Sequence, residues 1–235
     1  MARGLNKVIV VGDLGRDPEL RYTPEGKAVA AFSLVARRQW LTADGTPQQA
    51  EEWFNVIAWG AKAERCKQWL RKGNRVYVEG HLQTRTWVGQ DHLRRVRTEL
   101  VLSEMIPFAA IEPAPAADDA SGTFPQHINK VMVIGLVETE PEVRPTASGK
   151  LRANFSLAAS QSWVTSDGKR CETTEWFHVV TWGSLAEICR QWLSRGRRVY
   201  VEGYLHTYAW KNQLDQPHWR TELVAREMVV LDEHP

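Results

Sequence analysis

The chain has 235 residues, of which 43% are hydrophobic and 25% are charged, and its formal net charge is +2. These values are typical of a globular protein with one or two domains, and so small a charge does not by itself indicate a nucleic-acid partner. No stretch approaches the roughly 20 apolar residues of a membrane span, and the first residues lack a signal-peptide pattern, so we expect a cytoplasmic protein without membrane contact.

The numbers of tryptophans and cysteines are also informative. The chain has 11 tryptophans, several times the usual share, and three cysteines without a CxxC pair. Cys66 and Cys189 fall in helical patterns and are expected to be small buried hydrophobes, whereas Cys171 is expected in a polar loop. We therefore expect neither a disulfide framework nor a metal site.

Five strands and one helix are predicted in the first half of the chain. The strands are expected at 6–14, 28–40, 51–60, 75–87 and 92–105, and the segment 61–73, between the third and the fourth, carries apolar residues at helical spacing. Gly73 is expected to be the C′ residue of that helix. This layout is typical of the OB-fold, a small Greek-key barrel.

The third strand, "EEWFNVIAWG", has an unusual pattern. Side chains alternate across a strand, so Phe54, Val56 and Ala58 share one face and are predicted to fill the core. The other face holds Trp53, Asn55, Ile57 and Trp59, which places two indoles on the wetter side.

The chain contains an internal repeat, with two copies of one sequence unit 123 positions apart. "EWFNVIAWG" at 52 matches "EWFHVVTWG" at 175, and about half of the positions from 5 to 108 are identical to their counterparts. Ten of the tryptophans pair across this offset, and Trp219 stands opposite Val96. Residues 109–127, rich in Ala, Pro and Asp, have the composition of a linker. We therefore expect domains at 1–108 and 128–235.

Both copies resemble the DNA-binding domain of bacterial single-stranded DNA-binding protein (SSB). The resemblance lies in "NKVIVVGDLGRDPELRYTPEGKAVAAFSL", "EEWFNVIAWGAKAE", "WLRKGNRVYVEGHLQTRTW" and "TELVLSEM", and it covers nearly all of 3–107 and again 126–231. It implies an all-β chain of two tandem OB-folds, each a five-stranded Greek-key barrel. It further implies sequence-independent binding of single-stranded DNA in replication, recombination and repair, in the cytoplasm with the nucleoid.

Single-strand binders combine aromatic platforms with a positive groove. The stacking positions of the family fall on eight tryptophans of this chain: Trp40, Trp53, Trp59, Trp87, Trp163, Trp176, Trp182 and Trp210. The phosphate and polar contacts are expected from Lys7, Arg21, Asn55, Arg75, Arg85, Lys130 and His178. Residues 1–108 hold 17 Lys and Arg against 12 Asp and Glu, whereas 128–235 balance, so the first domain should attract phosphate more strongly.

Other aromatic residues have different expected roles. Trp69 and Trp192 are predicted to pack into the core, beside Leu70 and Leu193 on the apolar stripe of the helix. Phe32 and its counterpart could serve the core or the DNA face equally well, and no role is assigned to Trp219.

The sequence contains no HExxH, GxSxG or GxxxxGK[ST] motif, so we expect neither an enzyme nor a bound cofactor. A sequence-tolerant RNA chaperone, or an OB-fold adaptor for other proteins, remains the alternative function.

The resemblance implies a homodimer that supplies four OB-folds. Family members usually continue into a disordered segment with an acidic tip that recruits replication and repair proteins. This sequence ends in "VVLDEHP", and Asp232 and Glu233 do not make such a tip. Either the sequence is shortened or partner recruitment runs differently.

Overall fold

The structure, a computed structural model, describes residues 4–42, 44–88, 94–108, 127–164, 168–211 and 217–232. It contains two compact units, one within 8–129 and the other within 130–235 together with 1–7. The predicted linker lies outside the described residues except for His127.

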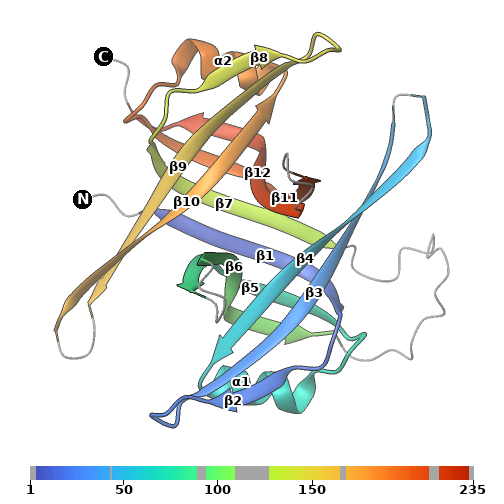
Figure 1. The fold of residues 1–235 in the computed structure, drawn as a ribbon, viewed down its shortest axis with the longest axis vertical. Helices are drawn as coiled ribbons and strands as arrows, with labels where there is room; N and C mark the ends of the chain where they lie inside the picture. The colour runs from blue at the N-terminus through green and yellow to red at the C-terminus, as the bar shows by residue number, and fades with distance from the viewer. Residues whose placement is uncertain are drawn as a thin grey trace. The chain divides into compact units, whose positions relative to one another are not determined.

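The described residues of the first copy form one helix and six strands, which Figure 1 labels. Their bounds are β1 (Leu5–Leu14), β2 (Glu19–Tyr22), β3 (Ala28–Leu41), β4 (Pro47–Trp59), α1 (Ala61–Trp69), β5 (Arg75–Val88) and β6 (Arg94–Pro107). The five predicted strands and the place of the helix are confirmed. The short strand β2, which pairs with β3, was not predicted.

The second copy repeats these elements at an offset of 123 residues, helix and strand bounds included. They are β7 (Ile128–Val137), β8 (Glu142–Pro145), β9 (Leu151–Val164), β10 (Arg170–Trp182), α2 (Ser184–Trp192), β11 (Arg198–Lys211) and β12 (Pro217–Val230). The duplication inferred from the sequence is therefore a duplication of the fold. Cys171 lies in strand β10 and not in the loop where it was predicted, because that strand starts at Arg170.

Strand pairing closes the first copy into a barrel. β1 pairs with β5 and, through Asp13 and Leu14, also with β3. β3 continues to β4, β4 pairs in parallel with β6, and β6 returns to β5. The same set of pairings closes the second copy. Antiparallel hairpins with one parallel closure form the Greek-key barrel of an OB-fold.

The side chains inside each barrel are apolar and come from the alternating inward positions of the strands. In the first copy Phe32, Leu34, Val56, Val78 and Leu100 are at most 1% exposed. Their counterparts in the second copy, Phe155, Leu157, Val179, Val201 and Leu223, are also buried. Phe32 and Phe155 are thus core residues, which settles the choice that the sequence left open.

A glycine in the "YVEG" motif allows β5 to bend onto β6. A Cβ atom on Gly80 would lie 2.1 Å from the carbonyl oxygen of Val101, and one on Gly203 would lie 2.0 Å from that of Val224. The strand register shifts at the same two points. Only a residue without a side chain fits there, because any Cβ would overlap the neighbouring backbone.

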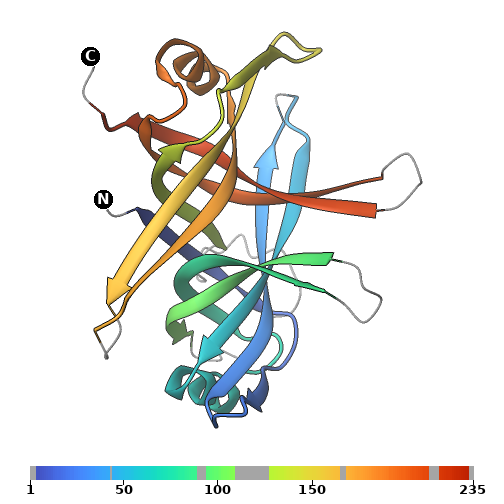
Figure 2. The same ribbon diagram turned by 60° about the vertical axis from the view of Figure 1, so that its left-hand side comes forward.

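The helix in each copy contacts the strands next to it, as Figure 2 shows for the first copy, where α1 contacts β2, β3 and β4. It ends at Trp69, earlier than predicted, because Leu70 is extended (φ −100°, ψ 141°) and fully buried. Gly73 therefore lies in the following turn (φ 86°) and is not the C′ residue. Both helices have nine residues, far short of what a membrane-spanning helix needs.

Candidate nucleic-acid interface

Strand β4 sorts its side chains as the alternation predicted. Phe54, Val56 and Ala58 are at most 5% exposed and face the core, whereas Trp53 is 55% exposed. Asn55, Ile57 and Trp59 lie on the same outer face and are half-buried. The outer face of β4 therefore carries two indoles, with Asn55 and Ile57 between them.

The ring of Trp53 lies close to the backbone of Gly15. A Cβ atom on Gly15 would lie 2.4 Å from Cζ3 of Trp53, and Ser33 Oγ is close to the same point. The missing side chain of Gly15 thus makes room for the indole. The sequence showed this glycine only as part of "GDLGRD", and its counterpart is Glu138, so the support is specific to the first copy.

Cations lie beside the second indole of each copy. Lys27 Nζ is 5.2 Å and the Arg85 guanidinium carbon 5.8 Å from the ring centroid of Trp59. In the second copy Lys150 Nζ is 5.9 Å from the ring centroid of Trp182, and the Arg152 guanidinium carbon 5.5 Å. Each pair of distances is within the reach of a cation–π contact. An aromatic face and positive charge thus occur together at the same place. Sequence analysis did not identify Lys27, Lys150 or Arg152, although Lys27 and Lys150 occupy matching positions in the two copies.

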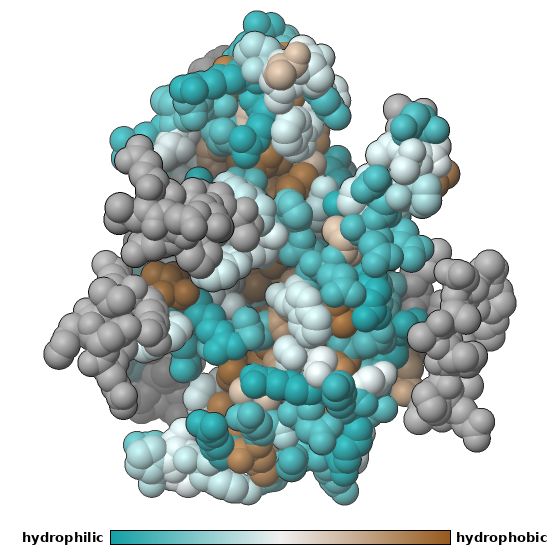
Figure 3. Space-filling view, turned by 45° about the vertical axis from the view of Figure 1, so that its right-hand side comes forward, coloured by the Kyte–Doolittle hydropathy of each residue, from teal (hydrophilic) through white to brown (hydrophobic). Residues whose placement is uncertain are grey.

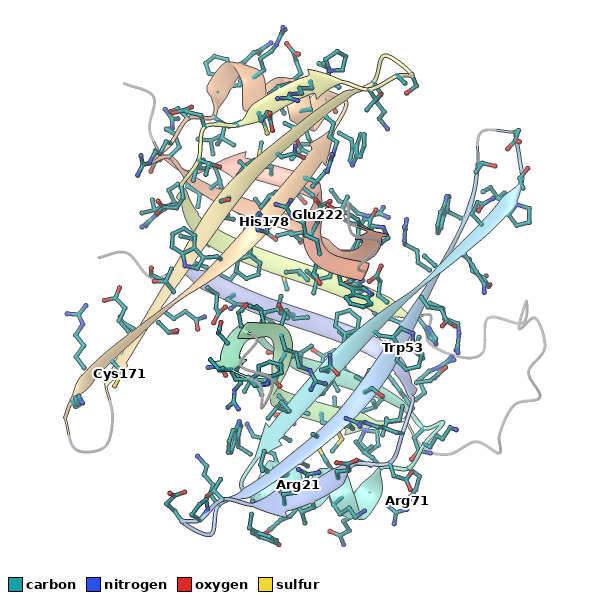
Figure 4. The ribbon with its side chains drawn as sticks, viewed as in Figure 1. Arg21, Trp53, Arg71, Cys171, His178 and Glu222 are labelled. Carbon is teal, nitrogen blue, oxygen red and sulfur yellow. The ribbon has the colours of Figure 1, made fainter. Side chains whose placement is uncertain are left out.

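The polar residue between the two indoles has an arginine partner in both copies. Arg97 on β6 donates to Oδ1 of Asn55, and Arg220 on β12 lies 2.9 Å from Nδ1 of His178. Burial lowers the pKa of His178, and the charge of Arg220 lowers it further, against a smaller opposing effect of Glu222. A neutral imidazole at neutral pH can accept a hydrogen bond from the guanidinium. Figure 4 shows His178 and Glu222 close together in the second copy.

Two further predicted stacking residues of the first copy, Trp40 and Trp87, lie toward the ends of the long strands β3 and β5. Trp40 is 38% exposed, with the Arg38 guanidinium carbon 4.1 Å from its ring centroid, and Trp87 is 43% exposed. In the second copy Trp176 is 60% exposed and Trp182 37% exposed. The side chains of the other two predicted tryptophans lie outside the described residues: Trp163 and Trp210.

Several predicted phosphate contacts form ion pairs within the protein. Arg75 Nε is 2.8 Å from Asp13 Oδ1, and Lys130 Nζ is 2.7 Å from Glu202 Oε1. Arg85 contacts a glutamate on β6. Arg21 is well exposed and 3.2 Å from Glu19, and Lys7 is half-buried on β1. Arg85 also lies over Trp59.

The prediction that Trp69 and Trp192 are core residues is wrong. They are 50% and 49% exposed, because the buried stripe of each short helix consists of an alanine and a cysteine and is followed by the buried Leu70 or Leu193. The Arg65 guanidinium carbon is 5.9 Å from the ring centroid of Trp69. Trp219 on β12 is 67% exposed, the largest exposed fraction of any described tryptophan.

Figure 3 shows the hydropathy of one face of the described residues. Strongly hydrophobic residues (brown) appear in small patches, and hydrophilic residues (teal) separate them.

Two OB-folds, each with exposed indoles and adjacent cations, define a class of oligonucleotide-binding modules. Comparison with known proteins leads to the same class. The model of the "Single-strand binding protein family" matches residues 5–108 and again 128–231. The chain belongs to this family.

Individual relatives are similar over large parts of the chain. "Single-stranded DNA-binding protein 1" of Chlorobaculum tepidum is 41% identical over 122 residues, which are 52% of this chain and 75% of the relative. The crystal structure of a deletion mutant of the single-stranded DNA binding protein from Thermus aquaticus matches with a TM-score of 0.75 at 24% identity, over 100% of this chain and 98% of that one. The wild-type protein matches with a TM-score of 0.73 at 23% identity, over 100% and 96%. These structures share the fold of both copies.

Proposed function

We propose that the chain binds single-stranded DNA without base preference and protects it during replication, recombination and repair. The observation that supports this most is the repeated outer face of β4 and β10. Each copy exposes a first indole, Trp53 or Trp176, and places cations beside a second, Trp59 or Trp182.

The arrangement favours single strands for a physical reason. A base can stack on an indole only if its face is free, and in a duplex both faces are covered by neighbouring base pairs. Every base has a π-face, so stacking accepts all four, and each stacked base contributes roughly 1–3 kcal/mol. The cations then neutralise the phosphates that accompany the bases. Binding of this kind needs no catalytic group.

The experiment is a set of titrations of the full chain, followed by quenching of its tryptophan fluorescence. The probes are a mixed-sequence single-stranded DNA, the same sequence as a duplex and the same sequence as RNA, at one salt concentration. We expect strong quenching and tight binding with single-stranded DNA and much weaker binding with the duplex. Equal affinity for the duplex would refute stacking as the mode of binding, and tighter binding of RNA would favour the RNA chaperone.

We also infer that two chains form a homodimer, because the family resemblance implies an assembly of four OB-folds and each chain supplies two. Because the proposed ligand is DNA, we expect the protein to be in the cytoplasm with the nucleoid.

A further inference from the structure

In both copies a buried glutamate contacts an arginine that lies over the second indole. Glu99 on β6 is 8% exposed and Glu222 on β12 is 7% exposed, and both are among the few buried charged residues in the described part of the chain. A buried carboxylate is costly unless a cation faces it. The partner is an arginine in both cases. Arg85 Nε is 3.4 Å from Glu99 Oε2, and the terminal Nη2 of Arg152 is 3.4 Å from Glu222 Oε1.

These two arginines do not occupy matching positions. Arg85 lies on β5, and its counterpart in the second copy is Tyr208, whose hydroxyl donates to Glu222 over 3.3 Å. Arg152 lies on β9, directly opposite Trp182 in the strand register, and its counterpart is Val29, directly opposite Trp59. The glutamate and the tryptophan are repeated, whereas the guanidinium reaches the same place from a different strand.

We infer that Glu99 and Glu222 are positioning residues for DNA binding. Each holds a guanidinium over a stacking tryptophan, so that one preformed unit receives both a base and its phosphate. This inference rests on the proposed function, because it explains how that same site is prepared for its ligand.

The chemistry of the guanidinium permits this double role. It has five N–H donors in a fixed plane, and Arg85 forms an ion pair with Glu99 on its Nε side without donating a hydrogen bond to Glu99 Oε2. In Arg85 this contact leaves the terminal Nη groups facing away from the glutamate, whereas Arg152 contacts Glu222 through its terminal Nη2. The side chains of Arg85 and Arg152 are 51% and 35% exposed, so a phosphate can approach both. A side chain that is already held in place loses less conformational freedom when the ligand binds, which raises affinity.

The inference and simple electrostatics predict opposite effects for one substitution. Glu99→Gln removes a negative charge near the proposed path of the phosphates, and on charge alone it should strengthen binding. If Glu99 positions Arg85, the same substitution releases the guanidinium and weakens binding. The sign of the change therefore separates the two explanations.

The test uses the full chain with Trp176 and Trp182 replaced by alanine, so that the first copy dominates binding of an oligo-dT probe. We expect Glu99→Gln to weaken binding at least about threefold, as expected for a lost preorganised contact. Glu104→Gln is the control, since it makes the same charge change at an exposed position of β6 and should not weaken binding. Unchanged or tighter binding by Glu99→Gln would overturn the inference.

A second test swaps the arginine from β5 to β3. Binding that is restored by this swap cannot result from loss of structure. Arg85→Tyr should weaken binding to a similar degree, and the double variant Arg85→Tyr with Val29→Arg, which copies the second domain, should restore most of it. Failure of Val29→Arg to restore binding in a chain whose melting temperature is unchanged would overturn the inference. If Glu99→Gln unfolds below the assay temperature, the swap decides alone.

Failure of the inference can be told apart from failure of the proposed function. If the parent chain does not bind oligo-dT, the proposed function is refuted. If the parent binds and neither Glu99→Gln nor the swap behaves as expected, only the positioning role is refuted.

Discussion

At the scale of single residues, exposure alone does not identify a stacking tryptophan. Trp53 and Trp69 are 55% and 50% exposed, yet their surroundings differ. Trp53 lies on the outer face of β4, in line with Asn55 and the cation-flanked Trp59. Trp69 ends α1, and among its described contacts is the guanidinium of Arg65 on the same helix. The shared face of β4, more than exposure, makes Trp53 a candidate platform.

Trp69 and Leu70 are neighbours with opposite expected contributions to stability. Leu70 is fully buried, so Leu70→Ala should lower the free energy of unfolding by about 2–5 kcal/mol through lost packing and a cavity. Trp69→Ala removes a half-exposed side chain and should cost less than about 1 kcal/mol. Urea unfolding of both variants measures the difference. A loss for Trp69→Ala as large as that for Leu70→Ala would show that the indole packs more tightly than its exposure indicates.

The residue scale also shows which positions the sequence could and could not reveal. A strand has a period of two, so the alternation in "EEWFNVIAWG" was enough to separate Phe54 and Val56 from Trp53. A helix of nine residues has only a narrow buried stripe, and the prediction that Trp69 belongs to it failed because Leu70 turns inward just after the helix ends. The arginine over Trp182 was out of reach, because its position in the strand register depends on tertiary pairing.

At the scale of elements, a charge cluster ties several strands of the first copy to the residue that precedes β7. Asp13 on β1 contacts Arg75 on β5 and Arg37 on β3, at 2.8 and 2.9 Å. His127 donates toward Asp13 at 3.3 Å and accepts the backbone N–H of Arg37. Burial alone would raise the pKa of Asp13, but the His127 hydrogen bond and the Arg75 guanidinium outweigh it and hold that pKa far below its usual value. The second copy has Leu136 at this position, so the cluster is not repeated.

The charge cluster predicts a pH-dependent contribution of Asp13 to stability. Because folding lowers its pKa, the stabilisation is complete above the unfolded value of 3.8 and is lost as the pH falls below it. Asp13→Asn should therefore cost about 1–3 kcal/mol at pH 7 and progressively less below pH 3.8. Urea unfolding at pH 7 and at pH 3, with hydrogen exchange of β1 to localise the effect, measures this.

Leu136→Asn in the second copy is the matched control. It introduces the same residue at the corresponding position, but it removes no titrating group, so its effect on unfolding should not follow the pKa of an aspartate. A cost of Asp13→Asn that is equal at both pH values would contradict the assigned contacts.

The charge difference between the two copies predicts unequal salt dependence. Residues 1–108 have 17 Lys and Arg against 12 Asp and Glu, whereas 128–235 have equal numbers of both. Each phosphate neutralised on a single strand adds about −0.7 to the slope of log affinity against log salt. Chains that keep only the first pair of β-strand tryptophans, Trp53 and Trp59, should show a steeper slope than chains that keep only Trp176 and Trp182. Equal slopes would mean that the extra arginines of the first copy do not contact the nucleic acid.

At the scale of the whole molecule, the chain is a tandem repeat whose elements keep the same bounds at an offset of 123 residues. The repeat was visible in the sequence because about half of the matched positions are identical. The short strand β2 was not, because four residues carry too little periodicity to stand out beside the turns that flank them. The order of the elements predicted a closed barrel, and the pairing of β1 with both β3 and β5 confirms it.

The proposed homodimer predicts a mass twice that of the 26.8 kDa chain at micromolar concentration. Light scattering on the free protein measures this mass, and a dilution series shows whether the assembly is stable. A mass of one chain, with full binding of single-stranded DNA retained, would show that two OB-folds suffice and would contradict the dimer.

The most direct measurement compares two variants of the whole chain in titrations with oligo-dT. In one, Trp53, Trp59, Trp176 and Trp182 are replaced by alanine; in the other, Trp69 and Trp192 are replaced. If the outer faces of β4 and β10 bind the bases, the first variant should stay folded and lose roughly 1–3 kcal/mol of binding for each base that it no longer stacks. The second should bind like the unaltered protein. Binding that survives the first set of substitutions, or that is lost with the second, would contradict the placement of the interface.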